Sequence, residues 1–387
     1  MKLLGEHLLD EEHVMIRETA RRFAETEIKP NAMQWEEAGS YPRELHRIAA
    51  DTGLLGVGFP EELGGAGGGA LHLVMCVEGL MRGGSTGVTV GLGTHQIALP
   101  PLLHIGSREQ QQRFIPAVLR GEKLAALAVT EPGAGSDVAG TRTRARRDGD
   151  HYVVEGEKLY ISGGTRADEL MTLVRTGDDP HGGLTFLLIP RASEGVQVSA
   201  PLRKTGWWAS DTAEIRFDQV RVPVERRIGP EGAAFLALMR NFQMERISLA
   251  AYGVATAAIA LEEAMRWSRE RRAFGRPLTG FQVTRHRIAD MATTVESARV
   301  FTLTVAAALD RGEYRVREVS MAKNIAARAA VEVTHEAVQL FGGLGYMRET
   351  LVERLSRDAR LLPIGGGTEE IMKEIIAREL DLRGASR

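Results

Sequence analysis

Residues 128–137 read AVTEPGAGSD, and this stretch separates two kinds of sequence pattern. Its two glycines, its proline and its short polar side chains predict a tight loop. Glycine allows the backbone to approach a ligand closely, and successive N–H groups can bind polar atoms. Taken alone, the loop is equally consistent with an ordinary turn between two domains.

Upstream of this loop the sequence is typical of helices joined by glycine-rich turns. Apolar residues recur at three- and four-residue spacings over residues 10–29, which predicts a helix. Ser107 suits an N-cap, and the helix that it starts is expected to end at Gly121. We therefore expect an N-terminal helical domain over residues 1–123.

Downstream of the loop, short runs rich in β-branched and aromatic residues alternate with turn signals as far as Gly229. The six runs are HYVVEG, KLYISGG, LMTLVRTG, GLTFLLIP, GVQVSAPL and AEIRFDQVRVP. Because no helical pattern lies between them, they predict an antiparallel sheet rather than alternating strand–helix units. This central β domain is expected over residues 124–230.

The helical period returns from Glu231 onward. Four helices are predicted, over residues 231–271, 281–310, 315–341 and 368–382, with glycine-rich breaks between the later ones. Long helices with short connections are typical of an up-down bundle, expected over residues 231–387. The predicted fold class is therefore α+β: an N-terminal helical domain, a central antiparallel β domain and a C-terminal four-helix bundle.

Composition excludes several classes of protein. The net charge of −2 gives no overall basic field for nucleic acid. The histidines are scattered without ligand spacing, so no metal site is expected. One cysteine, Cys76, excludes internal disulfides and suits a reducing compartment. The uncharged stretch Ile247–Leu261 is shorter than the roughly 20 apolar residues of a membrane span. We expect a soluble, cytoplasmic protein with no membrane span.

The loop is the first of a series of motifs. TEPGAGSD (130–137) is followed by GEKLYISGG (156–164), KTGWWASDTAEIRFDQVRVP (204–223), RRAFG (271–275), FQ (281–282), QLFGGLGY (339–346) and GGTEEIMKEIIAREL (366–380). In this order, and over nearly the whole chain, they resemble the FAD-dependent acyl-CoA dehydrogenase family. The family's domain order agrees with the one predicted above from sequence patterns.

The resemblance implies two sets of FAD contacts. The flavin side is expected to involve Leu127, Val129, Thr130, Gly135, Ser136, Tyr160, Ser162, Thr368 and Glu370. Thr130 and Ser136 would be hydrogen-bond donors there, while Tyr160 and Ser162 stand where most members have Trp and Thr.

The second set is expected to reach FAD from a neighbouring subunit. Arg271, Phe274 and Gln282 resemble the segment at the pyrophosphate, and Gln339, Leu340, Gly342 and Gly343 resemble the loop at the adenosine half. A guanidinium fork suits a diphosphate, and the motif context favours this role for Arg271 over the alternative of a solvated surface arginine. The resemblance implies at least a dimer, and the family is usually tetrameric.

The resemblance also requires a carboxylate that removes the proton α to a thioester. Many members carry it just before Gly-Thr near the last helix, but this chain has Gly366 there. Another branch, which includes long-chain and isovaleryl-type enzymes, places the base on the first long bundle helix, and its motif puts Glu245 in that position. On a helix Glu245 shares a largely apolar face with Leu238 and Leu249, so burial should raise its pKa. The alternative is a surface glutamate paired with Arg246 or Arg240.

Further substrate contacts follow from the same resemblance. Ser136, Phe242 and Arg246 correspond to acyl-CoA contacts, together with Gly366 and Gly367. The N–H of Gly366 would polarise the thioester carbonyl together with a flavin ribityl hydroxyl. The glycine run 365–367 suggests a roomy site for long or branched chains.

The expected activity is α,β-dehydrogenation of an acyl-CoA in fatty acid (lipid) metabolism, with electrons passed to an electron-transferring flavoprotein. Two kinds of alternative remain. One keeps the fold and FAD but changes the reaction, to an acyl-carrier-protein dehydrogenase, an oxidase or a monooxygenase. The other is a non-catalytic acyl-CoA-binding protein, which the absence of glutamate at Gly366 suggests.

Overall fold

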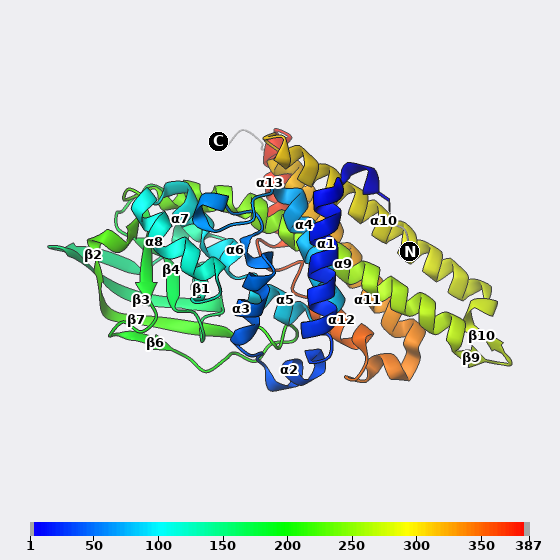
Figure 1. Cartoon of the computed structure of the whole chain (residues 1–387). Helices are drawn as coiled ribbons and strands as arrows, with labels where there is room; N and C mark the ends of the chain where they lie inside the picture. Colours follow the sequence, from blue (N-terminus) through cyan, green and yellow to red (C-terminus); the bar gives the residue numbers. More distant parts are fainter. Residues whose placement is uncertain (1–3, 383–387) are drawn as a thin grey trace.

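The computed structural model describes residues 4–382. The first part is helical, and its segments lie between the sheet and the long helices and over part of the sheet (Figure 1). The helices are α1 (Glu11–Phe23), α2 (Ala32–Ala38), α3 (Glu44–Asp51), α4 (Ala70–Leu80), α5 (Thr86–Leu92), α6 (His95–Ala98), α7 (Pro100–Ile105) and α8 (Arg108–Leu119). The Ser107 hydroxyl accepts the N–H of Gln110, as predicted for an N-cap, but the helix ends two residues before Gly121.

The sheet occupies one side of the molecule in Figure 1. Its strands are β1 (Ala125–Ala128), β2 (Arg144–Asp148), β3 (His151–Ser162), β4 (Glu169–Arg175), β5 (Leu184–Pro190), β6 (Val196–Val198), β7 (Thr212–Pro223) and β8 (Arg227–Ile228). The order is β6-β7-β3-β2-β4-β5-β8, with β1 paired to β4. The pairing is antiparallel except for two parallel pairs, β1 with β4 and β2 with β4.

Three strands gave no recognisable signal in the sequence. β1 is short and rich in alanine, β2 is almost entirely charged, and β8 has two residues. Conversely, HYVVEG and KLYISGG form one strand, β3, rather than two. A bulge at Gly156, with φ at 142°, bends β3 without ending it.

The bundle contains α9 (Ala234–Glu270), α10 (Gln282–Asp310), α11 (Val316–Phe341), α12 (Leu351–Ala359) and α13 (Glu369–Glu379), with a small hairpin, β9 (Arg272–Ala273) and β10 (Arg276–Pro277), after α9. The prediction of four helices missed α12, whose nine residues lie between two glycine-rich breaks. The last helix ends at Glu379 rather than at residue 382.

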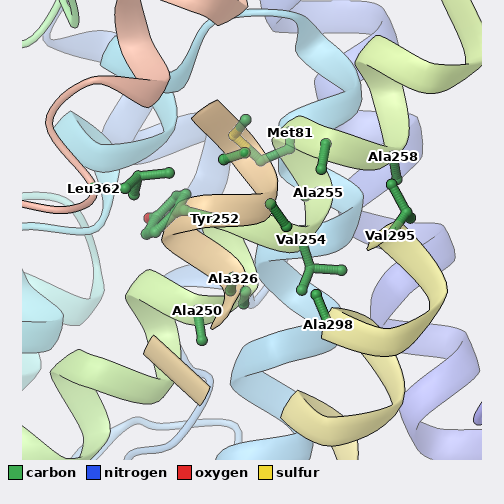
Figure 2. Close-up of a cluster of buried hydrophobic side chains, with 14 of the residues drawn as sticks. Met81, Ala250, Tyr252, Val254, Ala255, Ala258, Val295, Ala298, Ala326 and Leu362 are labelled. Atoms are coloured by element: carbon green, nitrogen blue, oxygen red, sulfur yellow. The ribbon is translucent and has the colours of Figure 1, made fainter. Parts of the chain in front are cut away.

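The core of the bundle is built from small side chains. Ala250, Val254 and Ala258 of α9 face Ala326 of α11 and Ala298 of α10 (Figure 2). At Gly253 a Cβ would lie 2.6 Å from the carbonyl oxygen of Ala326, so only glycine permits this helix contact. Residues of α4 belong to the same hydrophobic cluster.

Helix α9 is long and apolar enough, by length and composition alone, to cross a membrane. However, 78% of its most apolar window is buried inside the protein. Its apolar surface is therefore used in the core. The same helix also connects the bundle with the sheet domain, because its first turns pack against the sheet domain through Ala234 and Leu238.

Candidate active site

The loop after β1 is fastened to strand β3. The carbonyl of Thr130 accepts the N–H of Leu159 at 2.8 Å. Lys158, which is fully buried, donates from Nζ to the carbonyl of Val129 at 3.0 Å and to Glu131 Oε1 at 2.7 Å. The loop is therefore held at the sheet by the buried ion pair between Lys158 and Glu131.

Glu131 completes this fastening. Its carboxylate also accepts the N–H groups of Arg142 at 2.7 Å and Thr143 at 3.0 Å. Burial alone would raise the pKa of Glu131, but the Lys158 ammonium and these donors hold it below its ordinary value. Burial lowers the pKa of Lys158 to about 8. Sequence reasoning missed both residues, although both lie inside the quoted motifs.

Tyr160 and Ser162 stand at the end of β3. A second irregularity in the β3–β7 pairing, between Lys158 and Ile161, leaves Tyr160 with a φ of 60° and a side chain 66% exposed. A left-handed backbone at a bulky residue is strained and is concentrated at functional sites. An uncovered aromatic ring next to a loop that carries the hydroxyls of Thr130 and Ser136 is chemically suited to a planar ring with polar edges, such as a flavin, and the N–H of Leu159 ties that loop to the strand of Tyr160.

Phe242 and Glu245 lie on successive turns of α9. Phe242 packs against the cluster that contains Val129 and Leu127, so α9 meets the β1 loop here. Glu245 is half-buried, and its Oε2 is buried without a hydrogen-bond partner among residues 4–382. Burial raises the pKa of Glu245 to about 7, against the opposing effect of Arg246 and Lys323. The described residues include no ion pair of Glu245 with Arg246 or Arg240, which was the alternative interpretation.

Gly366 lies directly beside this carboxylate. Its φ of 64° is left-handed, and a Cβ built on it would lie 3.4 Å from Glu245 Oε1 and 2.2 Å from Leu249 Cδ1. Within the described chain its N–H donates no backbone hydrogen bond. The end of the Leu249 side chain lies where a side chain on Gly366 would stand. The expectation of a roomy acyl site stays a prediction.

Two cations hold the turn around Gly366. Arg246 donates from Nε to the carbonyl of Gly366 at 3.4 Å, and Lys323 of α11 donates from Nζ to the carbonyl of Gly367 at 2.6 Å. Lys323 is 1% exposed, and burial lowers its pKa to about 8. Sequence reasoning did not identify Lys323, because it lies in a helical stretch without a motif.

The start of α13 closes this part of the site. The Thr368 hydroxyl accepts the N–H of Ile371 as an N-cap, and Glu370 is exposed. Glu369, beside it, pairs with Lys373 at 2.8 Å and with Arg328. The cap fixes the direction in which α13 leaves the Gly366 turn.

The other predicted cofactor contacts lie elsewhere in the chain. Arg271 follows α9 and is roughly 39 Å from Glu245 at 1.5 Å per residue. The β9–β10 hairpin projects at the end of the bundle away from the sheet (Figure 1). Phe274 on this hairpin is 95% exposed with a φ of 51°. Gln282 begins α10 close by and is exposed.

The loop after α11 lies at the same end of the bundle. The Trp267 indole donates to the carbonyl of Leu340 at 3.2 Å and stacks on Phe341, while the Arg271 guanidinium lies 6.0 Å from the Trp267 ring. Gln339, Gly342 and Gly343 are exposed here. One chain therefore divides the predicted contacts between two distant ends, so a single flavin beside Glu245 cannot contact both sets in the same chain.

Comparison with known proteins assigns the chain to one family along its length. Residues 10–122, 126–220 and 234–380 match the N-terminal, middle and C-terminal domains of acyl-CoA dehydrogenases. The chain is similar to a probable acyl-CoA dehydrogenase from Mycobacterium abscessus, with 49% identity and a TM-score of 0.95 over 96% of this chain and 100% of that one.

Two further relatives bear on substrate and cofactor. Cyclohexane-1-carbonyl-CoA dehydrogenase of Geobacter metallireducens is 38% identical over 372 residues, which are 96% of this chain and 97% of the relative. A glutaryl-CoA dehydrogenase from Mycobacterium smegmatis in complex with FADH2 is 27% identical, with a TM-score of 0.93 over 99% of this chain and 98% of that one.

Proposed function

Because the chain belongs to the acyl-CoA dehydrogenase family, we propose that Glu245 is the base that removes the α proton of an acyl-CoA. The protein is an FAD-dependent oxidoreductase with the acyl-CoA dehydrogenase fold. The observation that carries the assignment of the base is the position of Glu245 Oε1, 3.4 Å from where a Cβ on Gly366 would stand. Many family members carry the catalytic carboxylate at the position of Gly366, and in this chain the Glu245 carboxylate lies beside that position.

The proposed reaction converts the acyl-CoA to the trans-2-enoyl-CoA. Glu245 accepts the α proton on a carboxylate oxygen, and FAD, when bound, accepts the hydride from the β carbon. A pKa of about 7 leaves a large share of Glu245 ionised near neutral pH and still makes it a useful proton acceptor. Its Oε2 is buried and has no hydrogen-bond partner among the described residues, so no other group competes for the proton there.

Besides a base, the reaction needs a hydrogen-bond donor to the thioester carbonyl, and the backbone of the Gly366 turn supplies one in this proposal. The thioester carbonyl must be polarised so that the α proton becomes acidic, and an N–H donor with no other partner can do this. The N–H of Gly366 is such a donor, and Arg246 and Lys323 fix its peptide neighbours. In this proposal Arg246 and Phe242, whose guanidinium and ring lie 5.4 Å apart, contact the thioester end of the CoA together with Ser136 and Gly367.

The two distant sets of cofactor contacts support an assembly of at least two chains. In this proposal Arg271, Phe274, Gln282 and residues 339–343 bind the pyrophosphate and adenosine of a flavin whose ring is held by the neighbouring subunit. The strained, almost fully exposed Phe274 is then covered by that subunit. We expect a homotetramer, and an electron-transferring flavoprotein as the acceptor of the electrons.

Anaerobic titration of the purified yellow protein with acyl-CoAs of different chain length and branching tests the reaction. Bleaching of the oxidised flavin band by one chain class supports the dehydrogenase. Unchanged absorption with every acyl-CoA, but bleaching with acyl-carrier-protein thioesters, would transfer the proposal to that substrate. Binding without any bleaching would indicate the non-catalytic alternative, and rapid reoxidation by oxygen would indicate an oxidase or a monooxygenase.

A further inference from the structure

A buried lysine donates a hydrogen bond to the turn that lies beside the proposed base. Lys323 lies on α11, and its Nζ donates to the carbonyl of Gly367 at 2.6 Å. A buried ammonium is costly unless its donors are satisfied, and methylene packing alone would be served better by leucine or methionine. The charge at this position therefore requires an explanation.

The carbonyl that Lys323 binds belongs to a strained turn. Gly366 and Gly367 have φ angles of 64° and 96°, both in the region that disfavours other residues. A charge-assisted hydrogen bond is stronger than a neutral one, so Lys323 stabilises this conformation. The N–H of Gly366, the proposed thioester donor, is one residue from the carbonyl that Lys323 holds.

Charged groups from three helices meet around Lys323. Glu245 and Arg246 of α9, and Glu369 and Glu370 at the start of α13, all act electrostatically on Lys323. Arg378, farther along α13, acts on Arg246, while Arg328 and Lys373 pair with Glu369. Lys323 and Arg246 are the cations that favour the ionised form of Glu245, against the burial of its carboxyl group.

We propose that Lys323 is a positioning residue for the reaction, one that holds the Gly366–Gly367 turn in its left-handed form and keeps Glu245 ionised near neutral pH. This inference rests on the proposed function, because it needs Glu245 as the base. It assigns no contact between Lys323 and the substrate. Its action passes through the Gly367 carbonyl and through the electric field at Glu245.

Three substitutions separate the two effects. Lys323→Met removes both the donor and the charge, Lys323→Gln keeps a donor without the charge, and Lys323→Arg keeps the charge. Lys373→Met is the matched control, since it removes an exposed lysine that pairs with Glu369 outside the turn.

Two quantities are measured for each purified variant in its flavin-bound form. The protonated-carboxyl infrared band that disappears in Glu245→Gln reports the ionisation of Glu245 without any substrate. The rate of flavin reduction by a good acyl-CoA, measured against pH, reports the working enzyme. Lys323→Met and Lys323→Gln should raise both midpoints by about one pH unit, which lowers the rate about tenfold on the acid side.

The remaining variants distinguish electrostatics from structure. Lys323→Arg should restore the midpoint, and Lys373→Met should leave both midpoints unchanged. If Lys323→Met does not fold, Lys323→Gln supplies the same comparison. An unchanged infrared midpoint in the uncharged variants would overturn the electrostatic part of the proposal. Equal rates for Lys323→Met and wild type on the alkaline side of both midpoints would overturn the part that concerns the turn. Failure of the proposed function would show separately, as normal flavin reduction by Glu245→Gln.

Discussion

Two carboxylic acids in this protein, the half-buried Glu245 and the buried Asp358, share two properties. Burial raises the pKa of each to about 7, and each has one buried oxygen without a hydrogen-bond partner in the described chain. Asp358, at the end of α12, is 1% exposed. A raised pKa and an unpartnered oxygen are therefore not enough to identify a base.

The surroundings of the two groups differ. Asp358 accepts the N–H of Trp207 at 2.6 Å, and it lies against Glu36, which also raises its pKa. Glu36 in turn contacts Arg357 at 3.5 Å and accepts the N–H of Trp208 at 3.2 Å. Asp358 thus belongs to a closed polar cluster that joins α2, α12 and the loop before β7.

Glu245 instead lies beside a turn, residues 366–367, that has a backbone N–H group without a partner in the described chain. Its neighbours Arg246 and Lys323 donate to the carbonyls of Gly366 and Gly367 rather than to its carboxylate. The N–H of Gly366 next to it is free of backbone partners within residues 4–382. The comparison shows that a raised pKa becomes informative when the carboxylate lies next to a backbone N–H without a partner and outside a closed polar cluster.

The largest expected effect separates the two carboxylates directly. Glu245→Gln should lower the rate of flavin reduction by about a thousandfold, within the range of general-base catalysis. Asp358→Asn, which still offers an oxygen to the Trp207 N–H, should change that rate by less than about tenfold on the same scale. Anaerobic stopped-flow mixing with an acyl-CoA measures both. Equal losses in the two variants would remove the distinction drawn here.

The second-largest expected loss of activity comes from changing the Gly366 turn beside Glu245. Gly366→Ala must adopt a φ of 64° and place a Cβ 2.2 Å from Leu249 Cδ1, so the turn or the helix must shift. We expect a loss of about 10- to 100-fold in kcat/KM, since misplacing reacting groups by an ångström costs on that order. Gly365→Ala is the control, because its Cβ would have ordinary contacts with Leu361 from 3.7 Å. Similar kinetics for the two alanine variants would contradict the importance of this turn.

The smallest effect is thermodynamic. The folded-state pKa of Glu245 is above its ordinary value, so the folded state binds the proton more tightly than the unfolded chain. The free energy of unfolding therefore decreases as pH rises towards about 7. Glu245→Gln should not show this decrease, because glutamine has no proton to lose. We expect the variant to gain about 2 kcal/mol over wild type between about pH 5 and pH 8, allowing for partial exposure. Urea unfolding at several pH values measures this, and a constant difference would argue against a buried ionised carboxylate.

The sequence predicted the parts of the fold that have strong local patterns. The helical period of residues 231–341 identified α9, α10 and α11, and the runs rich in β-branched and aromatic residues identified β4, β5 and β7, whereas β3 was predicted as two strands. It missed β2, whose residues are nearly all charged, and α12, which is short. Their formation depends on neighbouring strands and helices, which a local pattern does not reveal.

Prediction of the site was limited in the same way. The apolar face of α9 indicated the raised pKa of Glu245, because helical spacing decides which residues share a face. The importance of Lys323 and of the Glu131–Lys158 pair could not be predicted, since their partners are backbone carbonyls or residues distant in sequence. The filling of the space at Gly366 by Leu249 likewise depends on how α9 packs against the turn. The roles assigned to the cofactor and substrate residues stay predictions.

The central claim is that Glu245 removes the α proton, and proton exchange tests it without hydride transfer. An acyl-CoA thioester that has α hydrogens but no β hydrogen, incubated with the flavoprotein in heavy water, should gain deuterium at the α carbon. Mass spectrometry follows this gain. The account predicts rapid exchange with wild type and with Asp358→Asn, and exchange at the uncatalysed rate with Glu245→Gln. Undiminished exchange with Glu245→Gln would contradict it.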